Sequence, residues 1–121
     1  MPELSSFDYA IVRVVPRVER GEFINAGVIV FCRTCRFLGA RVALDTQRLA
    51  ALAPEIDPGE VEEHLGVIPL VCSGDPAAGP IAHLDQAGRF HWLVAPRSTA
   101  IQTSPVHSGL ASDPEEALDH L

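Results

Sequence analysis

The sequence contains no lysine, and it has only three cysteines, one methionine and one tryptophan. Without lysine, neither Schiff-base catalysis nor the lysine-containing phosphate-binding loop is open to this chain. Nine arginines are its only basic residues apart from histidine, and sixteen acidic residues bring the formal net charge to -7. This charge argues against nucleic-acid binding, because phosphate contacts require a positive surface.

Long hydrophobic runs are also missing. The longest uninterrupted apolar run, residues 26–32, is too short to span a bilayer. Acidic residues but no basic residue precede Arg13, so we expect neither a signal peptide nor a membrane partner. An odd number of cysteines without such a signal predicts reduced thiols and a cytoplasmic location.

The length and composition are those of one globular domain. The chain has 121 residues, of which 47% are hydrophobic and 21% are charged. This length allows a core that needs no disulfide or metal, and we find neither an internal repeat nor a linker. We therefore expect a single domain over residues 1–121.

Four segments have the composition of strands. Residues 7–15, 23–32 and 37–44 are rich in β-branched and aromatic side chains and are separated by short turns, which predicts an antiparallel meander. Residues 99–103 predict an edge strand that ends before Pro105. Within the second segment, Asn25-Ala26-Gly27 indicates a bulge or a close backbone approach.

Helix signals follow the meander. Asp45, Asp57 and Asp113 are candidate N-caps, the last two each followed by proline, and Pro69 should kink or end the second helix. Residues 85–95 fit a strand or a helix capped by Asp85, and we favour the helix. These patterns predict an α+β fold: an antiparallel three- to four-stranded sheet, comprising the meander and the edge strand, with helices packed on one face.

Two clusters of reactive residues are weak signals. Cys32 and Cys35 form a C-x-x-C pair. A structural zinc site needs four ligands and no second pair follows. A redox role is not favoured either, because the pair falls in a predicted hairpin turn and not at the start of a helix, where a thiolate would be stabilised. The acidic residues next to His64 open a predicted helix, where the helix dipole favours negative charge on a solvated face. We therefore assign no catalytic residue, no metal site and no cofactor.

The segment 98–112 is unusual because it has no formally charged side chain and six hydroxyl groups. Together with Arg97 it offers donors suited to a phosphate or carboxylate. The alternative is an edge strand and loop whose hydroxyls satisfy backbone groups. The candidate ligand-binding residues are Arg97, Ser98, Thr103, Ser104 and His107.

Two stretches resemble a known family. FDYAIVRVVPRVERGEFINAGVIVFC at residues 7–32 and FHWLVAPRSTAIQTSPVHSGL at residues 90–110 are similar to the bacterial domain-of-unknown-function family 3037. The resemblance implies a small, stand-alone cytoplasmic protein without an established activity. Some members are associated with neighbouring genes for HipA-like kinase-fold proteins. Cys35 departs from the family pattern, in which we expect a charged or polar residue.

We therefore expect a small accessory or interaction module that binds another protein without its own catalysis, and a HipA-like kinase-fold protein is one candidate partner. The small size, the short terminal helix in need of a docking surface and the resemblance favour this interpretation. The alternative is a small-molecule binding protein or enzyme that acts on an anionic ligand through the 97–107 segment. That alternative requires Arg97, Ser104 and His107 to converge in one pocket.

Overall fold

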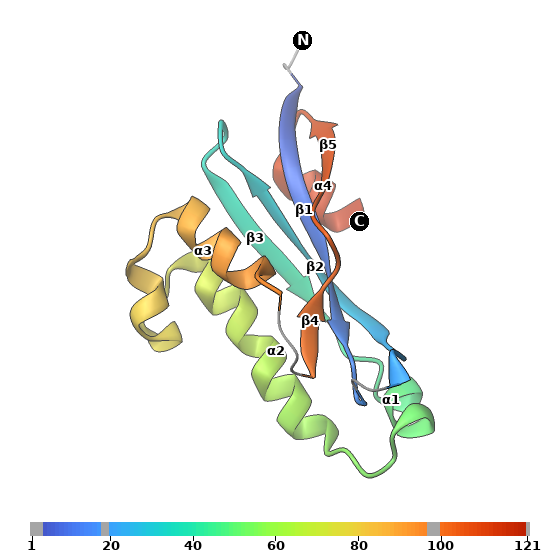
Figure 1. Cartoon of the computed structure of the whole chain (residues 1–121). Helices are drawn as coiled ribbons and strands as arrows, with labels where there is room; N and C mark the ends of the chain where they lie inside the picture. The colour runs from blue at the N-terminus through green and yellow to red at the C-terminus, as the bar shows by residue number, and fades with distance from the viewer. Residues whose placement is uncertain (1–3, 18–19, 97–99, 121) are drawn as a thin grey trace.

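A computed structural model of the chain describes residues 4–17, 20–96 and 100–120. One open antiparallel sheet of five strands forms its centre, and helices lie against both faces of the sheet (Figure 1). The predicted α+β fold is confirmed, and the sheet has one strand more than predicted.

The first three strands form the predicted meander. Each pairs antiparallel with the next, because turns rich in charged residues separate three apolar, β-branched segments. In the sheet they occupy the order β3-β2-β1. The three strands are β1 (Ser5–Val14), β2 (Ile24–Cys32) and β3 (Phe37–Val42).

The other side of β1 pairs with two short strands in succession. β4 (Ile101–Thr103), inside the predicted edge strand 99–103, pairs with residues 12–14 of β1. β5 (His107–Ala111) pairs with residues 5–9 and was not predicted. Its sequence, His-Ser-Gly-Leu-Ala, lacks β-branched residues, so its extended conformation depends on the long partner strand and not on local preference.

A β-bulge occurs at the predicted Asn25-Ala26-Gly27 position. Val12 and Arg13 oppose Gly27 and Asn25, which leaves Ala26 without a partner on β1. The Ala26 carbonyl instead accepts a hydrogen bond from Ala43 (2.8 Å). The backbones are so close here that a Cβ on Gly27 would lie 2.3 Å from the Arg41 carbonyl oxygen.

Three helices cover one face of the sheet: α1 (Thr46–Leu52), α2 (Pro58–Ser73) and α3 (Gln86–Val94). The helix favoured for residues 85–95 is thus confirmed as α3. Its Phe90 ring stacks on Phe31 of β2 with 5.1 Å between ring centroids. Short 3-10 turns, η2 (Pro76–Ala78) and η3 (Pro80–His83), connect α2 to α3.

Aspartate caps begin these helices as predicted. The Asp45, Asp57 and Asp85 carboxylates each accept a hydrogen bond from a backbone N–H in the first turn, at 2.7–3.0 Å. Helix α2 continues for four residues past Pro69, so the proline does not end the helix. The buried residues Val71 and Cys72 anchor this last turn to the core.

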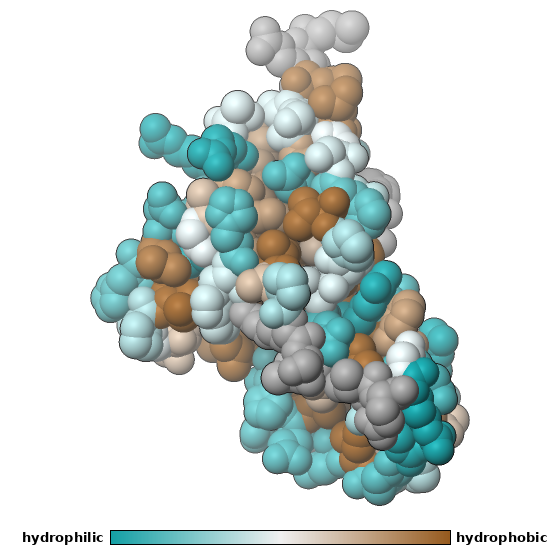
Figure 2. Space-filling view, in the orientation of Figure 1, coloured by the Kyte–Doolittle hydropathy of each residue, from teal (hydrophilic) through white to brown (hydrophobic). Residues whose placement is uncertain are grey.

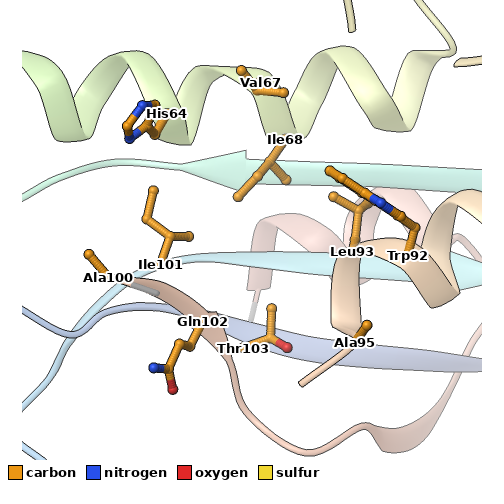
Figure 3. Close-up of a pocket in the computed structure, with 10 residues that line it drawn as sticks. All are labelled: His64, Val67, Ile68, Trp92, Leu93, Ala95, Ala100, Ile101, Gln102 and Thr103. Carbon is orange, nitrogen blue, oxygen red and sulfur yellow. The ribbon is translucent and has the colours of Figure 1, made fainter. Parts of the chain in front are cut away.

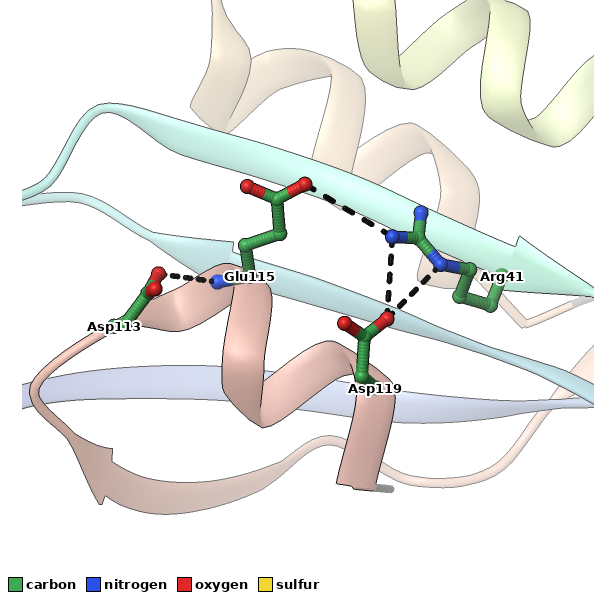
Figure 4. Close-up of polar contacts among 4 residues, drawn as sticks. All are labelled: Arg41, Asp113, Glu115 and Asp119. Carbon is green, nitrogen blue, oxygen red and sulfur yellow. Dashed lines mark hydrogen bonds and ion pairs between the residues drawn. The ribbon is translucent and has the colours of Figure 1, made fainter.

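The last helix, α4 (Pro114–His120), packs on the opposite face, so the helices are not confined to one side. Leu118 is its buried anchor, packed with Phe7, Val28 and Val30. Arg41 of β3 pairs with Asp119 (3.2 Å) and Glu115 (4.0 Å), as Figure 4 shows, with all three side chains more than half exposed. Because exposed ion pairs contribute little, apolar burial provides most of the docking energy. The short helix therefore has its docking surface within the chain.

On the face shown in Figure 2, hydrophobic side chains reach the surface in separate patches among hydrophilic ones. Within the described ranges, no helix is long and apolar enough to cross a membrane. The large apolar residues exposed by more than a third are Leu4, Phe23, Val67, Leu84, Trp92, Val106 and Leu110.

The close approach at Gly27 gives a test of the fold. We expect Gly27→Ala to lower the free energy of unfolding by about 1–3 kcal/mol, because the methyl group would collide with the β3 backbone. The control is Gly66→Ala in α2, where a Cβ meets no atom within 4 Å. This change should stabilise the protein by about 0.5–1 kcal/mol. Denaturant unfolding measures both, and equal stability of Gly27→Ala and wild type would contradict the observed register.

Candidate functional site

A cleft of about 370 Å³ lies between α2, α3 and β4 (Figure 3). We call it the α2–α3–β4 cleft. The residues that line it are His64, Val67, Ile68, Trp92, Leu93, Ala95, Ala100, Ile101, Gln102 and Thr103.

The floor of the cleft is apolar and its sides are exposed. Ile68 and Leu93 are 7% and 3% exposed and belong to the main core, against which Ile101 also packs. Val67 on α2 and Trp92 on α3 are each 38% exposed. The cleft thus joins the hydrophobic core directly to solvent, with a large apolar side chain on either side.

Strand β4 contributes alternate side chains to the cleft. In Figure 3, Ile101 and Thr103 point towards α2 and α3, whereas Gln102 points away, as expected for a strand in which successive side chains alternate between faces. The Thr103 hydroxyl donates a hydrogen bond to the Val94 carbonyl at 3.5 Å, which links β4 to the end of α3.

Two acidic residues lie on α2 one helical turn before residues that line the cleft. His64 and Val67 line it from α2, and Glu60 and Glu63 precede them by four residues each. Residues four apart lie on the same side of a helix, so the two exposed carboxylates flank the cleft. The solvated acidic helix face predicted from the sequence is present, and it borders an apolar opening.

The candidate ligand-binding residues do not share one location. Thr103 lines the cleft, and Arg97 and Ser98 lie outside the described residues. His107 is exposed on β5, with its ring centroid 5.4 Å from that of Tyr9. Thr103 and His107 therefore lie on opposite faces of the sheet, because Thr103 opposes the core residue Val12 and His107 opposes Tyr9.

Ser104 has a structural position between β4 and β5. It is 3% exposed, and its hydroxyl accepts a hydrogen bond from the Ile11 amide (2.8 Å) and donates one to the Pro105 carbonyl (2.9 Å). Its own amide donates to the Ile11 carbonyl (2.8 Å). The hydroxyl thus satisfies a β1 backbone group at the point where β1 stops pairing with β4 and begins to pair with β5. This is the role expected if the segment is an edge strand and loop whose hydroxyls satisfy backbone groups.

Sequence reasoning did not identify Val67 and Trp92. The helical spacing of Val61, Leu65 and Ile68 defined the core stripe of α2, and Val67 lies outside that stripe. An apolar residue beside a complete stripe is a signal for a second apolar surface. Trp92, the only tryptophan, gave no positional signal, because residues 85–95 fitted two kinds of element.

The three cysteines occupy different environments. Cys32 is buried at the end of β2, Cys35 is exposed in the β2–β3 turn, and Cys72 is buried in α2. No group of three or more His, Cys, Asp or Glu residues suited to a metal ion occurs in the part of the chain that the structure describes. Burial raises the pKa of the Cys72 thiol to about 12, and the nearby Arg89 guanidinium acts in the opposite direction.

Comparison with known proteins identifies a family. Residues 9–121 match the family described as "Protein of unknown function (DUF3037)". No curated protein and no solved structure matches the chain significantly.

The hydroxyl of Ser104 is the basis of a stability test. Ser104→Ala removes the buried hydroxyl that accepts a hydrogen bond from the Ile11 amide. We therefore expect the free energy of unfolding to fall by about 1–3 kcal/mol. Ser108→Ala is the control, because Ser108 is exposed and its hydroxyl donates a hydrogen bond to the Asp8 carboxylate at the surface. Chemical denaturation of both variants measures the difference, and equal, small effects would refute the structural role.

Burial of Cys72 predicts a pH effect at alkaline pH. The thiol ionises near its usual pKa of 9.0 in the unfolded chain and at about 12 in the folded chain. Its contribution is fully present below pH 9 and is lost as the pH rises towards 12, by up to about 4 kcal/mol. Urea unfolding of wild type and Cys72→Ala between pH 8 and about 11 isolates this contribution. A stability difference that does not change with pH would contradict the burial of the thiol.

Proposed function

We propose that this chain, which belongs to the DUF3037 family, is an accessory interaction module. It binds another protein through the α2–α3–β4 cleft. The observation that carries this proposal is the apolar opening between Val67 and Trp92. The HipA-like kinase-fold protein implied by the sequence resemblance is the first partner to test.

The exposed apolar side chains favour a protein segment as occupant. Val67 and Trp92 are both 38% exposed above a floor of core residues. Covering such surface is favourable by about 25 cal/mol for each Å² removed from water. A partner side chain such as leucine, isoleucine or phenylalanine matches this apolar surface, and tryptophan is frequent among residues that dominate interface energies.

The acidic residues near the cleft indicate which charge the partner segment should carry. Glu60 and Glu63 flank one end of the cleft, and the chain as a whole carries a net charge of -7. Arginine or lysine next to the apolar anchor of the partner would complement these carboxylates and accelerate association. We therefore propose an apolar segment flanked by basic residues.

An anionic small molecule is the alternative occupant. The volume of about 370 Å³ lies in the range of ligand pockets, and Thr103 is one of the lining residues. The described lining residues nevertheless contain no arginine, and Ser104 and His107 are placed elsewhere. The apolar lining favours the protein partner over the anion.

Two valine substitutions test this proposal. Val67 lines the cleft, whereas Val106 is exposed to a similar degree, 44% against 38%, in the connection between β4 and β5. The tagged full-length chain, its Val67→Asp variant and its Val106→Asp variant are compared for binding of the purified HipA-like partner by calorimetry. Any other protein retained by wild type from the native host is identified by mass spectrometry and measured in the same way.

We expect Val67→Asp to weaken binding at least about tenfold, which is about 1.4 kcal/mol, and Val106→Asp to have little effect. Glu63→Arg should also weaken binding. Its effect should be larger at low salt than at high salt, because salt screens charge attraction. Equal loss with both valine variants, or no stoichiometric protein partner, would overturn the proposal. A bound anionic metabolite that is lost in Arg97→Ala would establish the alternative.

A further inference from the structure

The turn between β2 and β3 brings two thiols together. Cys32 is the last residue of β2 and pairs with Phe37, so only residues 33–36 connect the strands. Cys35 lies within this connection. The pair is at the opposite end of β2 from the bulge, and neither cysteine lines the α2–α3–β4 cleft.

Several contacts fix the turn. The Arg36 amide donates to the Arg33 carbonyl (3.2 Å), and Arg36 has a positive φ of 53°. From α3, the Gln86 side-chain amide donates to the Arg36 carbonyl (2.9 Å). The turn is therefore held by its own backbone and by the helix packed next to it.

The Cys32 sulfur has its own fixed surroundings. It lies 3.5 Å from the Thr34 hydroxyl, and its S–H donates to the Ser6 carbonyl of β1 at 3.6 Å. The Cys32 thiol is also the main cause that lowers the pKa of the Cys35 thiol. Both thiols thus belong to one short, ordered turn, three residues apart.

The two thiols differ in access to solvent. Cys32 is 1% exposed, whereas Cys35 is exposed. Hydrogen bonds from the Cys32 thiol and then from Ser5 hold the pKa of the Cys35 thiol below its usual value. An oxidant from solvent therefore meets the Cys35 sulfur first, in a form enriched in thiolate, with the second thiol next to it.

A disulfide needs no group beyond these two. A structural zinc ion needs four ligands, and no third His, Cys, Asp or Glu joins the pair among the residues that the structure describes. We propose that Cys32 and Cys35 are an oxidation-sensitive dithiol, which a hydroperoxide converts into an intramolecular disulfide that closes the β2–β3 turn.

The reaction has two steps. The Cys35 thiolate attacks one peroxide oxygen, the O–O bond breaks, and Cys35 becomes a sulfenic acid while the leaving alkoxide or hydroxide takes up a proton. The Cys32 sulfur then attacks the Cys35 sulfur, the S–O bond breaks, and hydroxide leaves as water with the Cys32 proton. Two thiols are oxidised to one disulfide, and one peroxide is reduced to an alcohol or water plus a second water.

The disulfide also changes the contact with β1. Oxidation removes the Cys32 S–H, so its hydrogen bond to the Ser6 carbonyl is lost. Residue Ser6 belongs to the part of β1 that pairs with β5. The redox state of the turn is thereby linked to the β1–β5 end of the sheet.

Tryptic peptides report the bond directly. The reduced full-length chain is treated with one equivalent of hydrogen peroxide, its remaining thiols are alkylated, and it is analysed by mass spectrometry before and after digestion. Cleavage after arginine places Cys32 in peptide 21–33, Cys35 in peptide 34–36 and Cys72 in a third peptide. We expect an intact mass lower by two hydrogen atoms before alkylation, and peptides 21–33 and 34–36 joined by a bond that a reductant breaks.

The variants distinguish this bond from other oxidation. Cys35→Ser changes an exposed residue and should abolish the linked peptide, whereas Cys72→Ser should keep it. Sulfinic or sulfonic acid at Cys35, or a disulfide between two chains, with Cys32 still alkylated, would overturn the proposal. Stoichiometric zinc bound by both thiols in the reduced protein would overturn it as well.

Discussion

The β1–β2 strand pair is buried on both faces, and this burial dictates where the other elements pack. One set of alternate side chains, including Val12 and Ile29, packs against α2 and α3, and the other, including Phe7 and Val30, packs against α4. A strand pair that is apolar on both sides is stable only when both sides are covered. The positions of all the packed helices follow from this requirement.

The cleft is a consequence of how the first face is covered. Helices α2 and α3 both pack on the core, and the cleft lies between them next to the short strand β4. Because β4 contributes only three residues to this edge, it extends the sheet without closing the space between the two helices. A single layer of helices thus leaves core residues next to solvent at one place, and the acidic start of α2 flanks that place.

Hydroxyl groups in the 98–112 segment illustrate how one composition suits two roles. Ser104 satisfies backbone groups of the interrupted edge, whereas Thr103 binds the end of α3 and lines the cleft. The sequence contains both residues side by side, and alternation along the strand sends their side chains in different directions. Neither Ser104 nor His107 shares the cleft with Thr103, because the register with β1 separates them.

The elements that could be predicted from the amino-acid sequence are those with local causes. Helix caps at Asp45, Asp57 and Asp85, the three-strand meander and the bulge at Ala26 all follow from side-chain and turn preferences within a few residues. These preferences act before any distant contact forms, so a single sequence was sufficient to predict them.

Other features depend on residues far apart in the chain and become visible only when the chain is folded. Strand β5 forms because β1 is long enough to pair with it, and α4 lies on the second face because Leu118 packs against the apolar side of β2 there. Val67 and Trp92 line one cleft only because two helices pack side by side. Local composition does not predict such pairings. Burial of apolar surface, which is non-local and non-directional, selects them when the whole chain folds.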